Sequence, residues 1–146
     1  WSELGELVQS GCSIGAHSIT HRNMARLSPA EVVDEALRSR RALSEHIGVA
    51  EAEISAFAFP GGRASPAACQ ALEPHFACAC TDRLGVVTAQ SRPMALPRID
   101  TYYLRSPRLM DLLPGRWFQP YIRAISIPRQ IRRSISDRLG DGVIRA

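Results

Sequence analysis

A strongly signalled helix lies between two strand-like segments, and this order limits the folds that the chain can adopt. Ser28, Pro29 and Glu31 fit the N-cap, first and third positions of a helix, which is the pattern of a capping box. The apolar residues that then recur at helical spacing are Val33, Ala36, Leu37, Leu43 and Ile47. Residues 12–16 and 54–59 read as strands on either side of this helix. A strand, a helix and a second strand in succession favour an α/β fold with a parallel sheet.

The alternation of helix and strand continues to about residue 100. Ser65-Pro66 predicts the start of another helix, which runs to about Glu73. Residues 76–81 alternate as a strand, residues 82–85 read as a turn, and residues 96–99 read as a further short strand. The four cysteines have neither a CxxC nor a zinc-finger spacing, so we expect small buried thiols.

The C-terminal third is strongly basic. All 18 basic residues are arginine, and residues 92–146 contain 11 of them against 4 acidic residues, whereas residues 1–91 contain 7 against 10. Apolar residues at 125–135 predict an amphipathic helix only imperfectly, because Pro128 interrupts it. A basic tail of this kind is more often a solvated end than a contact with an anionic surface, and both readings stay open.

Two histidines follow the first predicted strand at a spacing of four residues. His17 and His21 end the run Gly15-Ala-His-Ser-Ile-Thr-His21. Imidazoles so spaced can bind one metal ion, and ligand sites gather at the ends of strands in α/β sheets. From the spacing alone, two surface histidines without a ligand are an equal alternative.

The surroundings of these histidines resemble the second motif of the polysaccharide deacetylase family, a family of carbohydrate esterases. The similar stretch is residues 11–28, in which a strand leads into the histidine loop and a capped helix. Residues 57–62, Phe-Ala-Phe-Pro-Gly-Gly, resemble the third motif, and residues 96–99 resemble a segment found late in the same variant. The matches occur in the order of the family and cover about residues 1–105.

The resemblance implies a distorted (β/α) barrel, of which this chain would hold the later half to two-thirds. Residues 1–105 would be a partial polysaccharide deacetylase domain, and residues 106–146 would be a basic tail that is partly helical or disordered. The chain begins at Trp1 inside a predicted helix, so we expect it to be part of a longer protein.

The implied activity is hydrolytic removal of acetyl groups from a polysaccharide or amino-sugar polymer. His17 and His21 would bind a divalent ion, zinc by expectation, and the N–H of Gly61 would hold the oxyanion of the reaction. The residues that the resemblance places at the substrate are Phe59, Pro60 and Arg98. A plain turn at residues 60–62 and a structural ion pair of Arg98 are the alternatives.

The implied partner is a polysaccharide or oligosaccharide substrate, with no nucleic acid. The resemblance leads us to expect an enzyme of the cell envelope, or one that is exported or periplasmic.

The chain also departs from the family pattern. No aspartate precedes His17, although the first motif of the family supplies aspartates for the metal and for the base. Ala58 stands where many relatives have arginine, and a late Leu-x-His motif is missing. The chain is therefore either part of a working deacetylase or a non-catalytic relative that binds carbohydrate or metal. In a third reading, the arginine-rich tail is the functional part.

Overall fold

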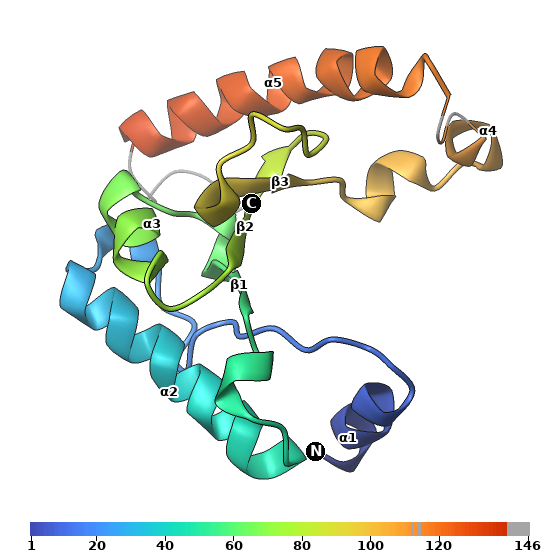
Figure 1. Cartoon of the computed structure of the whole chain (residues 1–146). Helices are drawn as coiled ribbons and strands as arrows, with labels where there is room; N and C mark the ends of the chain where they lie inside the picture. The colour runs from blue at the N-terminus through green and yellow to red at the C-terminus, as the bar shows by residue number, and fades with distance from the viewer. Residues whose placement is uncertain (112, 114, 140–146) are drawn as a thin grey trace. The chain divides into compact units, whose positions relative to one another are not determined.

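The computed structural model describes residues 1–111, 113 and 115–139 (Figure 1). The α-helices are α1 (Ser2–Gln9), α2 (Pro29–Ile47), α3 (Pro66–Leu72), α4 (Pro107–Met110) and α5 (Phe118–Leu139). The strands are β1 (Ala56–Ala58), β2 (Cys78–Leu84) and β3 (Leu96–Arg98). Single 3₁₀ turns lie at Met24–Arg26, Glu51–Glu53, Pro60–Gly62, Pro93–Ala95 and Thr101–Leu104.

The chain divides into two compact units, which are described separately. The first unit is Trp1–Asp82 with Ala89–Leu96, and the second is Arg83–Thr88 with Pro97–Ala146. The predicted boundary at residue 105 separates the part that resembles the family from the basic tail. The division into compact units does not test it. It stays a prediction.

A small sheet contains a parallel pair of strands, which lies in the first unit. The strand order is β1-β2-β3, and β1 runs parallel to β2 with Ala58 opposite Cys80. The strand predicted at residues 12–16 is reduced to one parallel bridge, in which Ala16 lies opposite Phe57. Ala16 donates its N–H to the Ala56 carbonyl oxygen and accepts from the Ala58 N–H, each at 2.9 Å. Since the pairings are parallel, the segments after Ala16 and after β1 emerge at the same edge.

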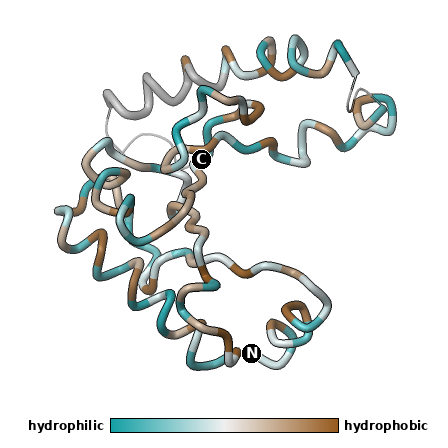
Figure 2. Tube along the Cα trace, viewed as in Figure 1, coloured by the Kyte–Doolittle hydropathy of each residue, from teal (hydrophilic) through white to brown (hydrophobic). Residues whose placement is uncertain are grey.

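Helix α2 begins and ends where the sequence predicts. The Glu31 N–H donates to the Ser28 hydroxyl oxygen, and the Glu31 carboxylate accepts from the Ser28 N–H at 2.9 Å, which completes the capping box. Gly48 ends the helix in the left-handed region, with φ 72°. Polar and apolar residues alternate along the helix (Figure 2).

The buried face of α2 differs from the predicted apolar stripe. Its buried residues are Val32, Glu35, Ala36 and Ser39. Val33, which the pattern placed in the stripe, is only half-buried. The face that α2 buries is therefore partly polar, and its two polar members contact the histidine loop described below.

Three phenylalanines dominate the core of the first unit. The Phe57 ring lies 5.3 Å from the Phe59 ring and 5.3 Å from the Phe76 ring, measured between centroids. Burial of such rings is a main apolar contribution to folding. The other buried members of this core are Ala16, Met24, Val32, Ala36, Ile54, Ala68, Leu72, Ala79 and Met94. The core anchors the strands whose ends form the candidate site.

The second unit has a core of its own, which is the smaller one among the residues that the structure describes. It consists of Leu84, Leu104, Phe118 and Ile122. Leu84 still belongs to β2, so the turn predicted at residues 82–85 is wrong: the strand continues because Leu84 is buried in this core.

Helix α5 runs through Pro128, although the sequence suggested an interruption there. Pro128 is exposed, so the carbonyl oxygen that loses its helical N–H partner can be hydrated. Among the described residues, no helix combines the length and the apolar character needed to cross a bilayer. Residues 140–146 of the predicted tail lie outside the described residues.

Candidate active site

The candidate site lies at the edge of the sheet where the Ala16 segment and β1 end. His17 directly follows the bridge at Ala16, and the turn Pro60–Gly62 follows β1. His17 contacts the end of β1, because its ring nitrogen Nδ1 lies 2.7 Å from the carbonyl oxygen of Ala58. The second and third motifs of the sequence therefore meet in space.

The bond to Ala58 fixes the tautomer of His17. A carbonyl oxygen can only accept a hydrogen bond, so Nδ1 must donate. In the neutral ring, Nε2 then has the free lone pair that a metal ion needs. The His17 N–H donates to the Ser39 hydroxyl oxygen at 3.3 Å, so α2 also holds the backbone of this residue.

His21 lies beside His17 at the other end of a tight loop. The two rings are 5.1 Å apart between centroids and inclined by 68°, and both residues are exposed. The His21 N–H donates to the Ser18 hydroxyl oxygen at 2.8 Å. Ser18 and His21 both have positive φ, 65° and 58°, which residues with a side chain rarely adopt.

Glu35 of α2 receives the loop between the histidines. Its Oε2 accepts from the Ile19 N–H at 3.2 Å and from the Thr20 N–H at 3.0 Å, and its Oε1 accepts from the Thr20 hydroxyl. The residue is 4% exposed. Burial raises the pKa of Glu35, but the hydrogen bonds from Thr20, Ser18 and Ile19 outweigh it and leave the pKa below its usual value. The side chain is therefore a buried carboxylate that faces several donors.

The histidine pair fits two positions of a metal site. Two imidazoles bound tetrahedrally to one zinc ion at about 2.1 Å have ring centres roughly 5 Å apart, and the observed separation is 5.1 Å. Within the part of the chain that the structure describes, no third His, Cys, Asp or Glu joins them to form a metal-binding group. These residues can therefore supply two ligands, and any others must come from outside them.

The turn after β1 presents backbone to the site more than side chains. Phe59 is 0% exposed and Pro60 is buried, so both side chains face the core. The Phe59 N–H donates to the Cys80 carbonyl oxygen at 3.0 Å, and the Gly62 N–H donates to the Phe59 carbonyl oxygen at 2.8 Å. Gly61 is exposed with φ 59°, which leaves its N–H as the candidate donor of the turn.

Arg98 and the two other histidines belong to other segments of the chain. Arg98 is exposed on β3 and belongs to the second unit. His46 lies in the last turn of α2, where its Nδ1 is 2.7 Å from the Ala42 carbonyl oxygen and its ring stacks on Trp1. His75 is half-buried, and its carbonyl oxygen accepts from Arg40.

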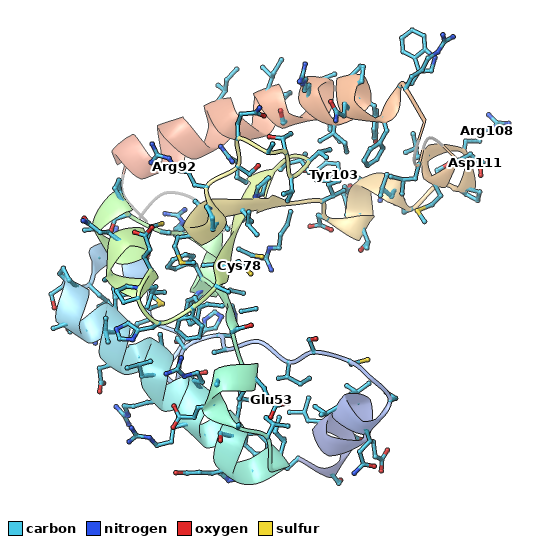
Figure 3. All side chains as sticks on the ribbon, in the orientation of Figure 1. Glu53, Cys78, Arg92, Tyr103, Arg108 and Asp111 are labelled. Carbon is cyan, nitrogen blue, oxygen red and sulfur yellow. The ribbon has the colours of Figure 1, made fainter. Side chains whose placement is uncertain are left out.

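The cysteines form no disulfide within the described residues. Cys12 is exposed, which corrects the expectation that the thiols are buried, while Cys69, Cys78 and Cys80 are half-buried. Burial raises the pKa of Cys69 and of Cys78, the latter on β2 (Figure 3). These two thiols are therefore weak nucleophiles at neutral pH, because little of the reactive thiolate is present.

Glu35 and Ser39 are the site residues that the sequence analysis missed. They stand four residues apart on the same face as Val32 and Ala36, so two polar residues interrupt an apolar stripe. That interruption was the available signal, because buried polar side chains need partners.

The likeness to known proteins agrees with this geometry. A family model described as polysaccharide deacetylase matches residues 1–75, which include both histidines and the turn after β1. No curated protein matches the chain.

Two solved structures share the fold. The deacetylase PplD of Streptococcus pyogenes, in complex with acetate, has a TM-score of 0.60 at 24% identity, over 67% of this chain and 42% of that chain. IcaB from Ammonifex degensii has a TM-score of 0.62 at 22% identity, over 82% of this chain and 52% of that chain. The chain thus spans about half the length of these structures or less.

These likenesses confirm the predicted fold class, an α/β fold with a small parallel sheet that corresponds to a partial barrel of the deacetylase type. The family model covers more than half of the chain and includes both motifs that meet at the edge of the sheet. The chain belongs to the polysaccharide deacetylase family.

Proposed function

We propose that the chain is part of a metal-dependent enzyme that removes acetyl groups from a polysaccharide or amino-sugar polymer by hydrolysis. The observation that supports this most is the contact of the two motifs, in which the ring of His17 meets the carbonyl oxygen of Ala58 at the end of β1 and His21 lies beside His17. A similar solved structure is a deacetylase in complex with acetate, the product of such a reaction. The substrate would be a polymer of the cell envelope or an exported one.

The histidines would hold the ion through Nε2 of His17 and a ring nitrogen of His21. A bound zinc ion supplies Lewis-acid activation of a carbonyl group and of water near neutral pH. The Ala58 carbonyl oxygen keeps His17 in the tautomer that can bind a metal ion. Many metal-bound histidines donate their other ring N–H to a carbonyl or carboxylate oxygen in the same way.

Gly61 would stabilise the oxyanion. Gly61 is exposed and has no side chain that could block a substrate. Its N–H belongs to a turn that the buried side chains of Phe59 and Pro60 anchor in the core. A preorganised backbone donor of this kind is among the larger contributions to acyl-transfer catalysis. The carboxylate of Glu35 is occupied by the donors of the loop, and no other Asp or Glu of the described residues joins the histidines in a metal-binding group. The base that accepts the proton of water would therefore come from outside the described residues.

The test is acetate release from N-acetylglucosamine oligomers by the protein expressed from its complete reading frame, with zinc added. We expect the His17→Ala, His21→Ala double variant to lose at least about a hundredfold in rate, since it removes both nitrogen ligands. His46→Ala is the matched control, because this histidine lies in the last turn of α2 and contacts Trp1 and Ala42. Unchanged acetate release by the double variant would disprove the proposal.

A second candidate function follows from the incomplete ligand set. The described residues supply two nitrogen ligands and no third, which suits a non-catalytic relative that binds metal or carbohydrate weakly. Zinc binding by calorimetry that depends on the histidine pair, together with no acetate release from any oligomer, would favour this alternative.

A further inference from the structure

We infer that Glu35 is a positioning residue that holds His17 and His21 at the separation one metal ion requires. The inference rests on the proposed function, because it concerns the same histidine pair. Glu35 itself lies on α2 and touches neither imidazole; it acts through the three residues between them.

The contacts of Glu35 cover the middle of the loop. One carboxylate oxygen accepts two successive backbone N–H groups, of Ile19 and Thr20, and the other accepts the Thr20 hydroxyl. One helical turn further along α2, Ser39 accepts the N–H of His17. Two side chains of one rigid helix therefore fix the start and the middle of the loop, and His21 follows directly.

The loop needs this support because its backbone is strained at two positions. Ser18 and His21 have φ of 65° and 58°, and each such residue is unfavourable in an unsupported chain. Strained conformations persist where surrounding contacts over-determine them. The His21 N–H bond to Ser18 closes the loop locally, and the contacts with Glu35 and Ser39 connect it to α2.

The burial of Glu35 points to the same role. It is 4% exposed beside Val32 and Ala36, where an apolar side chain would avoid the cost of removing a carboxylate from water. In the described part of the chain, its partners are the loop donors and not a basic side chain. The carboxylate is thus matched to the loop and serves no ion pair there.

The experiment compares zinc affinity, measured by calorimetry on the whole chain, for Glu35→Ala, Glu35→Gln and the control Asp34→Ala. Asp34 is the preceding residue of α2 and is exposed, and it forms an i,i+4 pair with Arg38. We expect Glu35→Ala to weaken zinc binding by about tenfold to a hundredfold, the usual effect of losing a group that orients a ligand. Asp34→Ala should bind as the wild type does.

Glu35→Gln distinguishes positioning from mere charge. Its amide oxygen can accept the two backbone N–H groups, and its NH₂ can donate to the Thr20 hydroxyl oxygen. We therefore expect the Gln variant to keep zinc affinity within about threefold of the wild type. Equal zinc affinity for the wild type and a folded Glu35→Ala, or a loss as large for Gln as for Ala, would overturn the inference.

A second measurement separates this inference from the proposed function. Amide hydrogen exchange of Ile19, Thr20 and His21, followed by NMR without metal, should accelerate at least tenfold in Glu35→Ala and not in Asp34→Ala. If the wild type binds no zinc, the proposed metal site fails, and the exchange rates alone decide the role of Glu35. Unchanged exchange in Glu35→Ala would then overturn it. If Glu35→Ala does not fold, Thr20→Val removes the hydroxyl bond to Glu35 at nearly constant shape, and its exchange rates decide in the same way.

Discussion

The two glycines after Pro60 differ in what a side chain would meet. A Cβ on Gly62 would lie 2.2 Å from the Asp82 Cβ and 2.3 Å from the Asp82 backbone nitrogen, whereas a Cβ on Gly61 would meet nothing within 4 Å. Both residues have positive φ, 66° and 59°. An alanine at either position would therefore incur the cost of a left-handed backbone conformation. At Gly62 the added Cβ would also clash with the backbone of Asp82.

We expect Gly62→Ala to lower the free energy of unfolding by about 2–4 kcal/mol, from overpacking and from the left-handed conformation together. Gly61→Ala should cost about 1 kcal/mol, from the conformation alone. Urea denaturation followed by circular dichroism measures both. Equal losses for the two variants would show that the backbone moves away from Asp82 without cost.

At the scale of elements, α2 is the helix whose start is best defined, and its cap can be tested alone. Ser28→Ala removes the hydroxyl that accepts from the Glu31 N–H and should lower the free energy of unfolding by about 1 kcal/mol. Ser28→Gly should cost only a few tenths of a kcal/mol, since glycine is itself a favourable N-cap. Thermal unfolding of both variants is the measurement, and an Ala variant no less stable than the Gly variant would contradict the cap.

The helices were more predictable than the strands, because their signals are local. The cap at Ser28 and the end at Gly48 depend on residues within one turn, and both were predicted correctly. The segment at residues 12–16 looked like a strand, but pairing depends on distant partners, and only Ala16 forms a bridge. Helix α5 passes Pro128 because that position is exposed, which the sequence alone does not reveal.

The candidate site was predictable in its motifs and not in its supports. The spacing of His17 and His21 indicated a pair, and the structure brings their rings together. The positive φ values and the bond from His17 to a backbone carbonyl leave no mark on residue type, so no pattern could reveal them. Glu35 was overlooked because a search for helical periodicity counts apolar residues and passes over polar ones. Phe59 and Pro60, expected at the substrate, have side chains that face the core.

At the scale of the whole molecule, the two units have cores of unequal size. Among the residues whose burial the structure describes, the first contains twelve buried residues around three phenylalanines, and the second contains four. Burial of apolar area is the main source of stability, so the second unit should open at lower denaturant.

Hydrogen exchange at rising urea concentration tests this expectation. The amides of Ile122 and Ser126 in α5 should lose protection before those of Phe57 in β1 and Ala79 in β2. Ile122→Ala should lower protection only in the second unit, by about 2–4 kcal/mol, and Leu72→Ala only in the first. Loss of protection in both units at one urea concentration would mean that they unfold as one cooperative body.

Ala58 contributes to the site through its carbonyl oxygen alone, which accepts from the ring of His17. Every amino acid has that oxygen. A mutation in this codon can therefore change the side chain at position 58 and still leave the hydrogen-bond acceptor for His17 in place. Natural selection is then free to alter position 58 for other demands, and genetic drift there does not erase the orientation of the histidine.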